Sequence, residues 1–310
     1  MNVKKYPISI ASYSFHGLLG QKKIDTFTYL ESLKYRYNVE YADLWTGYLP
    51  DFNTLEPISD DSEALLKKIR FSLDEKGITL ANLCVDGPHI WEYEKSLRDV
   101  HYKGAFNYVK AGIILGAKTI RIDLGVREDT ITEEQFDYIV KVYKELAALC
   151  KDNGIRVGTE NHWGASRDPK ILENIYKAVD SEAYGHLFHF GNFMDGKISE
   201  GLETVLKMAM HTHIPADSVP FAKEYIRRLV NAGYKGTFSI EHHSSQHEYE
   251  RVAWQLATVR NLITELEAEG FDTPVTGDYF RSIYASSAAL SGDSPWIASQ
   301  KSIQNPIEIG

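Results

Sequence analysis

The sequence predicts a closed (β/α)8 barrel. Along about 270 residues, eight short apolar or β-branched runs alternate with longer amphipathic segments, at intervals of roughly 25–40 residues. This alternation indicates a parallel sheet, and eight such units in a chain of this length fit a TIM barrel. The alternative, an open doubly wound sheet, usually has a Gly-rich first turn. Here that turn reads "SYSFHGLLGQ" and contains no G-x-G-x-x-G.

The elements follow from hydrophobic periodicity and from end signals. The clearest helix, 132–153, has Thr132 as its cap, Gln135 at the capping-box position and Gly154 as its stop. We expect the barrel to span residues 1–270, and the Ser-rich segment 271–310 to form a C-terminal extension packed on the barrel or on a partner. The predicted strands are 7–13, 41–45, 79–85, 119–125, 156–160, 186–190, 208–214 and 236–241, and the predicted helices are 24–37, 62–76, 95–115, 132–153, 169–179, 217–232, 246–268 and, more weakly, 198–206.

Composition excludes several classes of protein. The 310 residues are 43% hydrophobic and 25% charged, which is typical of a soluble globular chain. A membrane span or a signal peptide is not expected, because no apolar run reaches about 18 residues and the start "MNVKKYPISI" lacks an apolar core. Cys84 and Cys150 lie in apolar segments, as buried thiols of a cytoplasmic protein would. The net charge of −9, without a basic block, disfavours a nucleic-acid partner.

Polar side chains gather where the predicted strands end. In a barrel of this type the active site is built at the carboxyl ends of the strands, so these residues should converge. All of the 11 histidines except His101, His186 and His247 fall at such ends. In strand order the end residues are His16; Asp43 and Trp45; Asp86 and His89; Arg121 and Asp123; Glu160 and His162; His189 and Asn192; His211 and His213; and Glu241, His242 and His243.

A single histidine at a strand end is more often a structural residue, hydrogen-bonded within the fold, than a metal ligand. This simpler explanation applies to His16, His89, His242 and His243. Strands five to eight, however, end in succession in Glu, His, His and Glu. Burying two carboxylates beside two imidazoles costs several kcal/mol unless a cation or protons compensate. We therefore favour a metal site over a purely structural polar cluster.

The segments "GTENHWG" (158–164), "FHFGNF" (188–193), "AMHTHI" (209–214) and "FSIEHH" (238–243) carry a family resemblance. Over residues 7–268 the chain resembles the xylose isomerase-like TIM barrels, which include ketose 3-epimerases, other sugar isomerases and endonuclease IV. The resemblance implies that Glu160, His189, His211 and Glu241 bind one divalent metal. His189 stands where this group often has Asp, in the pattern Asp-x-Gly-Asn.

Two carboxylates and two neutral imidazoles balance the charge of a dication. A nitrogen-rich ligand set should favour Mn²⁺, Fe²⁺, Co²⁺, Ni²⁺ or Zn²⁺ over Mg²⁺, and Mn²⁺ is the ion that we expect. His213, two residues after His211, points to the same side of its strand and is a candidate for supporting the metal or contacting substrate.

The resemblance also implies the chemistry. In the epimerase branch, two metal-bound glutamates flank the substrate and exchange a proton at the carbon next to a carbonyl, a role that falls here to Glu160 and Glu241. His162 is on the same side of its strand as Glu160, and we expect it to serve as an additional base or to contact a substrate hydroxyl. The further expected substrate contacts are His16, Trp45, His89, Arg121, Trp163, Asn192 and His213.

The leading hypothesis is thus a metal-dependent isomerase or epimerase of a sugar or keto-sugar. One alternative is a lyase, since some relatives form the larger subunit of C-glycoside deglycosidases, which eliminate an oxidised sugar from an aromatic ring. An endonuclease IV-like repair enzyme would need a basic groove, and a binding module would not need both glutamates. The expected partners are a small carbohydrate or glycoside and either further copies of the chain or a small partner subunit.

Overall fold

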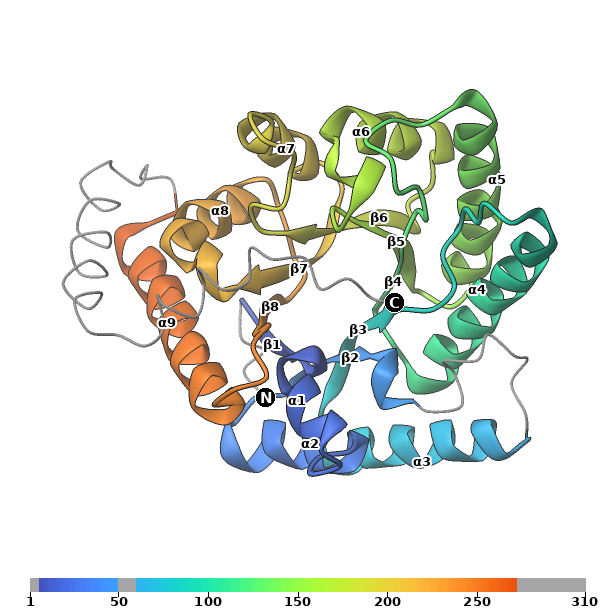
Figure 1. The fold of residues 1–310 in the computed structure, drawn as a ribbon. Helices are drawn as coiled ribbons and strands as arrows, with labels where there is room; N and C mark the ends of the chain where they lie inside the picture. Colours follow the sequence, from blue (N-terminus) through green and yellow to red (C-terminus); the bar gives the residue numbers. More distant parts are fainter. Residues whose placement is uncertain (1–5, 50–59, 272–310) are drawn as a thin grey trace. The chain divides into compact units, whose positions relative to one another are not determined.

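The barrel predicted from the sequence is confirmed (Figure 1). The structure is a computed structural model that describes residues 6–49 and 60–271. Within these residues eight parallel strands pair in sequence order, and β8 pairs with β1 to close the ring. The strands are β1 (Ile8–Ala11), β2 (Tyr41–Trp45), β3 (Thr79–Val85), β4 (Thr119–Ile122), β5 (Arg156–Glu160), β6 (Tyr184–His189), β7 (Ala209–Pro215) and β8 (Phe238–Glu241).

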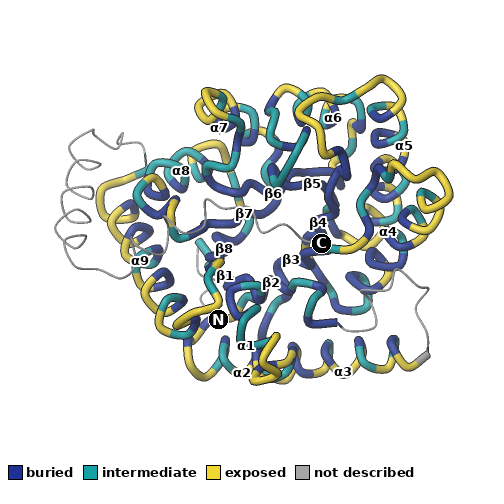
Figure 2. The backbone as a smooth tube through the Cα atoms, viewed as in Figure 1, coloured by how far each residue is buried: buried dark blue, intermediate teal, exposed yellow. Residues whose placement is uncertain are grey.

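Helices form a ring outside the barrel, with their inner sides buried and their outer sides exposed (Figure 2). The helix predicted at 24–37 continues as a π-helical segment after its first turns, and α1 was not predicted from the sequence. The α-helices are α1 (His16–Gly20), α2 (Thr26–Glu31), α3 (Asp60–Lys76), α4 (Lys95–Leu115), α5 (Glu133–Lys151), α6 (Pro169–Val179), α7 (Ile198–Val205), α8 (Val219–Asn231) and α9 (Glu248–Glu269). The shorter segments are the 3-10 turns η1 (Ser12–Phe15), η3 (Thr46–Tyr48), η5 (Gly164–Arg167) and η6 (Ala216–Ser218), and the π-helix η2 (Ser32–Arg36).

Local hydrogen bonds explain where these elements begin and how they attach to the sheet. The capping box of α5 is present: the Thr132 hydroxyl accepts from the Gln135 N–H at 3.2 Å, and the Gln135 side chain accepts from the Thr132 N–H at 2.8 Å. Buried tyrosines join helices to strands, since the Tyr143 hydroxyl donates to the Ile122 carbonyl at 2.6 Å. Their rings fill the core while their hydroxyls satisfy strand carbonyls.

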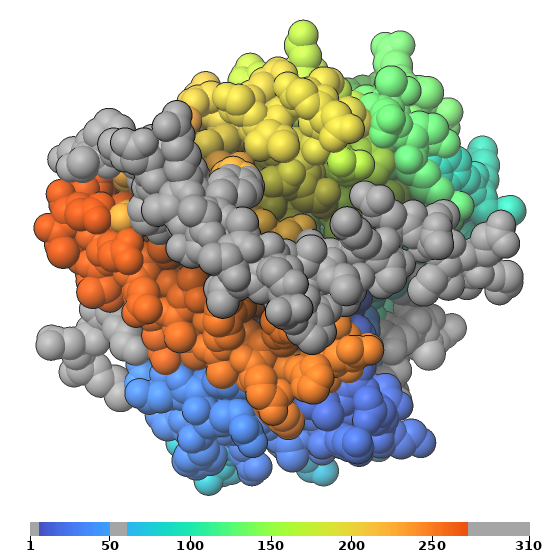
Figure 3. Space-filling model, turned by 60° about the vertical axis from the view of Figure 1, so that its left-hand side comes forward, coloured from blue at the N-terminus to red at the C-terminus, as the bar shows by residue number. Residues whose placement is uncertain are grey.

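The last described helix packs against the start of the chain. In Figure 3, α9 (orange) adjoins the N-terminal segment (blue). The Arg260 guanidinium donates to the carbonyls of Tyr37 and Asn38, both at 3.0 Å. This contact, together with the pairing of β8 with β1, fastens the two ends of the barrel to each other.

Three further expectations from the sequence concern the two cysteines, membrane-spanning helices and the C-terminal extension. Cys84 and Cys150 are buried free thiols, as predicted. The described helices are each too short or too polar to cross a membrane. The proposed extension begins at residue 271, and from residue 272 onward it lies outside the described residues, so its packing stays a prediction.

Two glycines allow β5 and β6 to approach each other closely. A Cβ atom on Gly158 would lie 1.7 Å from the carbonyl oxygen of Gly185, and one on Gly185 would lie 2.6 Å from Nη2 of Arg156. That guanidinium donates to the carbonyls of Tyr184 and Ala209, the first residues of β6 and β7. A larger residue at position 158 would therefore push apart the two strands that carry Glu160 and His189.

We expect Gly158→Ala to lower the free energy of unfolding by ~1–3 kcal/mol or more, because the added methyl group meets backbone rather than a movable side chain. Thermal and urea denaturation measure this. Gly20→Ala is the matched control: a Cβ there meets nothing within 4 Å, so its effect should stay within about 0.5 kcal/mol. Equal stability of the two variants would contradict the close packing described.

Candidate functional site

A pocket of about 790 Å³ opens at the carboxyl ends of the strands, as the barrel architecture predicts. Its floor contains Glu160, His189 and Glu241, which end β5, β6 and β8. One wall is polar and aromatic, and the other is largely apolar. The remaining lining residues are Tyr13, Trp45, Cys84, Asp86, Arg121, His162, Phe190, Gly191, Asn192, Ile198, Pro215, Asp217, Ser218, Phe221, Tyr225 and His243.

Four buried ligand-type atoms converge at the floor of the pocket. Glu160 Oε1 lies 2.9 Å from His189 Nδ1 and 3.1 Å from His213 Nδ1. Glu241 Oε2 lies 3.2 Å from His213 Nδ1 and 3.7 Å from His189 Nδ1. We call these four residues the floor cluster.

The floor cluster fits a divalent metal. Ligands held about 2.1 Å from one ion lie ~3–3.5 Å from their neighbours. The three shorter distances above are close to this range, and Glu241 and His189 lie somewhat farther apart, at 3.7 Å. Glu160 Oε2 faces Arg121, which leaves Oε1 as the oxygen turned toward the two imidazoles. Two carboxylates and two imidazoles are also a donor set that Mn²⁺, Co²⁺ and Zn²⁺ accept.

His211, one of the four ligands predicted from the sequence, is not part of the floor cluster, and His213 takes its place. His211 Nε2 lies 2.8 Å from Asp43 Oδ2, and its Nδ1 lies 3.0 Å from Thr237 Oγ1. Both ring nitrogens are therefore engaged elsewhere. The other three predicted ligands, Glu160, His189 and Glu241, are brought together as expected.

Strand geometry explains why His213, and not His211, belongs to the floor cluster. Residues two apart on a strand face the same side but lie ~6.6 Å apart along it, so only one of them can reach the layer of the strand ends. On β7 that residue is His213, which pairs in register with His189 of β6. His211 pairs with Leu187 and lies one layer deeper.

Arg121 neutralises the acidic groups beside the floor cluster. Its Nη1 donates to Asp86 at 2.7 Å and to Asp123 at 3.0 Å, and its Nε faces Glu160 Oε2 at 3.0 Å. Burial raises the pKa of Glu160, but the positive charges around it, first of all His213, hold it well below its ordinary value. Burial also raises the pKa of Glu241. His213 and His243 outweigh that effect, and the pKa lies well below its ordinary value. Both glutamates are ionised at neutral pH.

His162 lies at the pocket wall above Glu160. Its Nδ1 is 2.9 Å from Asp123 Oδ2, which fixes the ring and leaves Nε2 toward the pocket. Burial lowers the pKa of His162, but Asp123 and then Glu160 raise it, to about 9. The amide of Asn192 donates to the carbonyls of Asn161 and His162 at 2.7 and 2.8 Å, and so holds this loop in place.

The predicted substrate contacts divide into three groups, one of which is His213 alone, a member of the floor cluster and not of the pocket lining. Trp45, Arg121 and Asn192 line the pocket. His16, His89 and Trp163 are not among the lining residues in the described part of the chain: His16 stacks on Tyr13, and His89 packs edge-on against Trp163.

Several lining residues were not singled out from the sequence. Asp86 and His243 were noted at strand ends but received no role. The apolar wall, formed by Phe190, Ile198, Phe221 and Tyr225, comes from the β6–α7 loop and from helices α7 and α8, where sequence patterns give no sign of convergence.

A second group of ligand-type residues, His89, Glu92 and His101, is explained by hydrogen bonding. The backbone N–H of His89 donates to His101 Nδ1 at 3.2 Å. The proton of a neutral His101 is therefore on Nε2, which lies 3.6 Å from the Glu92 carboxylate. A metal would need the lone pair at that protonated nitrogen. We assign this group to the β3–α4 loop structure.

Comparison with known proteins identifies the family. Residues 37–292 match the family model of the xylose isomerase-like TIM barrel. The chain belongs to this family. A comparison with curated proteins gives no match.

Solved structures of related proteins share the fold. D-psicose 3-epimerase with D-tagatose from Clostridium cellulolyticum H10 is 15% identical, with a TM-score of 0.65 and 83% of this chain and 98% of that chain covered. The 3-keto-D-glucoside 4-epimerase YcjR from E. coli, in its apo form, is 13% identical, with a TM-score of 0.61 and 84% and 100% covered. A xylose isomerase-like TIM barrel protein from Mycobacterium smegmatis in complex with magnesium is 16% identical, with a TM-score of 0.61 and 83% and 98% covered. At these identities the likeness concerns the fold alone.

We expect His213→Gln to weaken Co²⁺ binding by more than the ~10–100-fold that is typical of changes outside the ligand shell, because it removes an imidazole of the floor cluster. His211→Gln is the matched change, and it should keep one Co²⁺ per chain, since a Gln amide can still donate to Asp43. Isothermal titration with Co²⁺ distinguishes the two. Loss of binding in His211→Gln alone would restore His211 as the ligand.

Proposed function

We propose that this protein is a metal-dependent isomerase or epimerase that removes a proton from the carbon next to a carbonyl of a sugar or keto-sugar. The observation that carries the proposal is the floor cluster, in which two ionised carboxylates face each other across two imidazoles at the base of a large pocket. Membership of the xylose isomerase-like family supports it, as do structural neighbours whose names are those of sugar epimerases.

Glu160, His189, His213 and Glu241 would hold one divalent ion, with Mn²⁺ as the expected metal. When bound, such an ion supplies Lewis acidity that polarises a carbonyl and stabilises negative charge on its oxygen. The nitrogen-rich ligand set, with His189 where relatives often have Asp, favours a softer ion than Mg²⁺.

The two glutamates would also move the proton. Both are ionised, which is the state that accepts a proton, and they come from strands β5 and β8, so they approach the pocket from different sides. Glu160 is engaged on both oxygens, by the histidines and by Arg121. Glu241 is the more exposed of the two, at 7% against 1%, and we propose that it is the base.

His162 would assist at the substrate. Asp123 holds its Nδ1, and its Nε2 is free to hydrogen-bond a substrate oxygen at the edge of the pocket. Positioned acid–base groups of this kind typically contribute ~10²–10⁴-fold to the rate.

We expect Glu241→Gln to retain part of its metal but to lose proton exchange at the substrate carbon, because an amide cannot take up the proton. His162→Ala should leave metal content intact and lower turnover ~10²–10⁴-fold. His16→Ala, outside the pocket lining, is the control and should leave turnover unchanged. The assay is deuterium incorporation from D₂O into any accepted sugar, and full exchange in both pocket variants would place the chemistry on other residues.

The apolar wall supports a second candidate, a lyase that acts on oxidised glycosides. The pocket volume of about 790 Å³ is in the upper part of the ~300–1,000 Å³ range of pockets for drug-sized ligands, so it has room beyond a single hexose. The rings of Phe190, Phe221 and Tyr225 could pack against an aromatic aglycone while the floor cluster takes the keto-sugar. The expectation of a small partner subunit belongs with this candidate, and that of a homo-oligomer applies to either; both stay predictions.

Parallel incubations decide between the two candidates. The protein is supplied with Mn²⁺ and given either free ketoses or 3-keto C-glycosides, and the products are followed by NMR and chromatography. An isomerase or epimerase should exchange or rearrange the ketoses, and release of a free aglycone would favour the lyase. Phe190→Ala should weaken binding of the glycoside more than that of the ketose, because only the glycoside reaches the apolar wall.

A further inference from the structure

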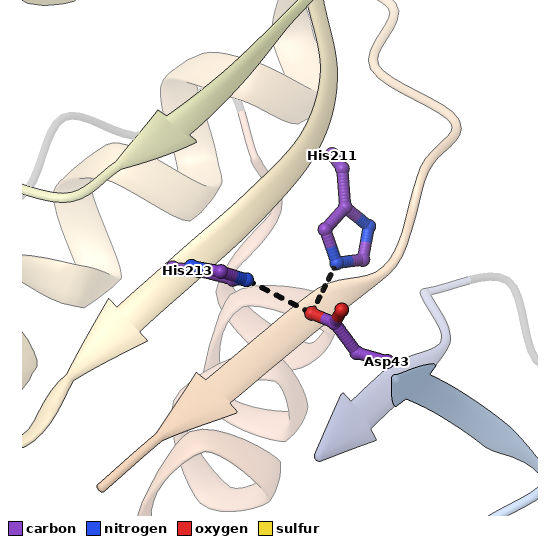
Figure 4. A group of neighbouring side chains, drawn as sticks. All are labelled: Asp43, His211 and His213. Carbon is purple, nitrogen blue, oxygen red and sulfur yellow. Dashed lines mark hydrogen bonds and ion pairs between the residues drawn. The ribbon is translucent and has the colours of Figure 1, made fainter. Parts of the chain in front are cut away.

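Asp43, on β2, lies directly beneath the floor cluster and contacts both histidines of β7 (Figure 4). Its carboxylate is wholly buried. Oδ2 lies 2.9 Å from Nε2 of His213 and 2.8 Å from Nε2 of His211, and it accepts from the Ser239 hydroxyl at 2.8 Å. Oδ1 accepts from the Asn82 amide at 2.8 Å. Four donors thus surround one carboxylate in the interior of the barrel.

This arrangement fixes the direction of each hydrogen bond. Both oxygens of Asp43 accept from firm donors, Oδ2 from the Ser239 hydroxyl and Oδ1 from the Asn82 amide. The carboxylate therefore acts as an acceptor, and His213 donates to it through a proton on Nε2. The lone pair for a metal is then on Nδ1, the atom that lies 3.1 Å from Glu160 and 3.2 Å from Glu241.

His211 supports the same carboxylate from below. The Ser9 hydroxyl donates to the Thr237 hydroxyl at 3.2 Å, so the Thr237 proton is directed to His211 Nδ1 at 3.0 Å. His211 Nε2 then donates to Asp43. Both ring nitrogens of this imidazole thus have a partner within the barrel.

We infer that Asp43 is a positioning residue that holds His213 in the tautomer and orientation in which Nδ1 faces the metal centre. Asp43 contacts neither substrate nor the other members of the floor cluster, and it acts through His213 alone. A carboxylate at Nε2 also makes the imidazole a more basic ligand. The inference rests on the metal centre of the proposed function.

Co²⁺ binding by the full chain tests this inference. Asp43→Asn removes the charge with little change in shape, so it should weaken Co²⁺ affinity ~10–100-fold and shift the visible absorption bands of the bound ion. Ser239→Ala is the matched control, because it removes a different donor to the same oxygen and leaves the bond to His213 in place. It should bind Co²⁺ as the unmodified protein does, with the same spectrum.

The outcomes separate the inference from the proposed function. Wild-type protein that takes up no Co²⁺ would contradict the metal centre itself. Wild-type binding with an unchanged affinity and spectrum in folded Asp43→Asn, as judged by circular dichroism, would overturn only the role of Asp43.

A measurement on the unmodified chain covers the case in which Asp43→Asn does not fold. The protein is labelled with ¹⁵N-histidine and loaded with Zn²⁺, and long-range ¹H–¹⁵N NMR reads the state of each ring nitrogen, with His213→Gln to assign the signal. The inference predicts a proton on Nε2 of His213 and a metal shift on Nδ1. A proton on Nδ1, or metal on Nε2, would overturn it.

Discussion

Two buried carboxylates, those of Glu160 and Glu241, must have positive charge beside them, and the upper half of the barrel is arranged around this requirement. They are 1% and 7% exposed, and an uncompensated charge at such positions would cost several kcal/mol. His213 lies between them, and Arg121 faces Glu160 from the opposite side. In the proposed function, a divalent ion takes the place of a proton at His213 Nδ1 and supplies Lewis acidity at the base of the pocket.

The interior around the floor cluster serves the same end. Gly158 lets β5 and β6, which carry Glu160 and His189, come close. Beneath the cluster, Asp43 accepts hydrogen bonds from both histidines of β7. Only the upper histidine reaches the carboxylates. In the proposed function, the chemistry at the base of the pocket would depend on hydrogen bonds made by residues outside the pocket lining.

The sequence predicted the fold well, because periodicity and end signals are local properties, as with the capping box of Thr132 and Gln135. It also predicted that polar strand ends would converge. The resemblance assigned the ligand role to His211 rather than His213, because both face the barrel interior and a period of two says nothing about depth. Their depth is set by the register of β6 with β7, which is a tertiary property. The apolar wall was missed for a similar reason, since its residues come from separate loops and helices.

Anomalous diffraction from crystals soaked in Mn²⁺ would locate the bound ion. We expect one strong peak per chain at the manganese edge, within about 2.0–2.3 Å of Glu160, His189, His213 and Glu241. No peak, or a peak between His89, Glu92 and His101 instead, would contradict this expectation.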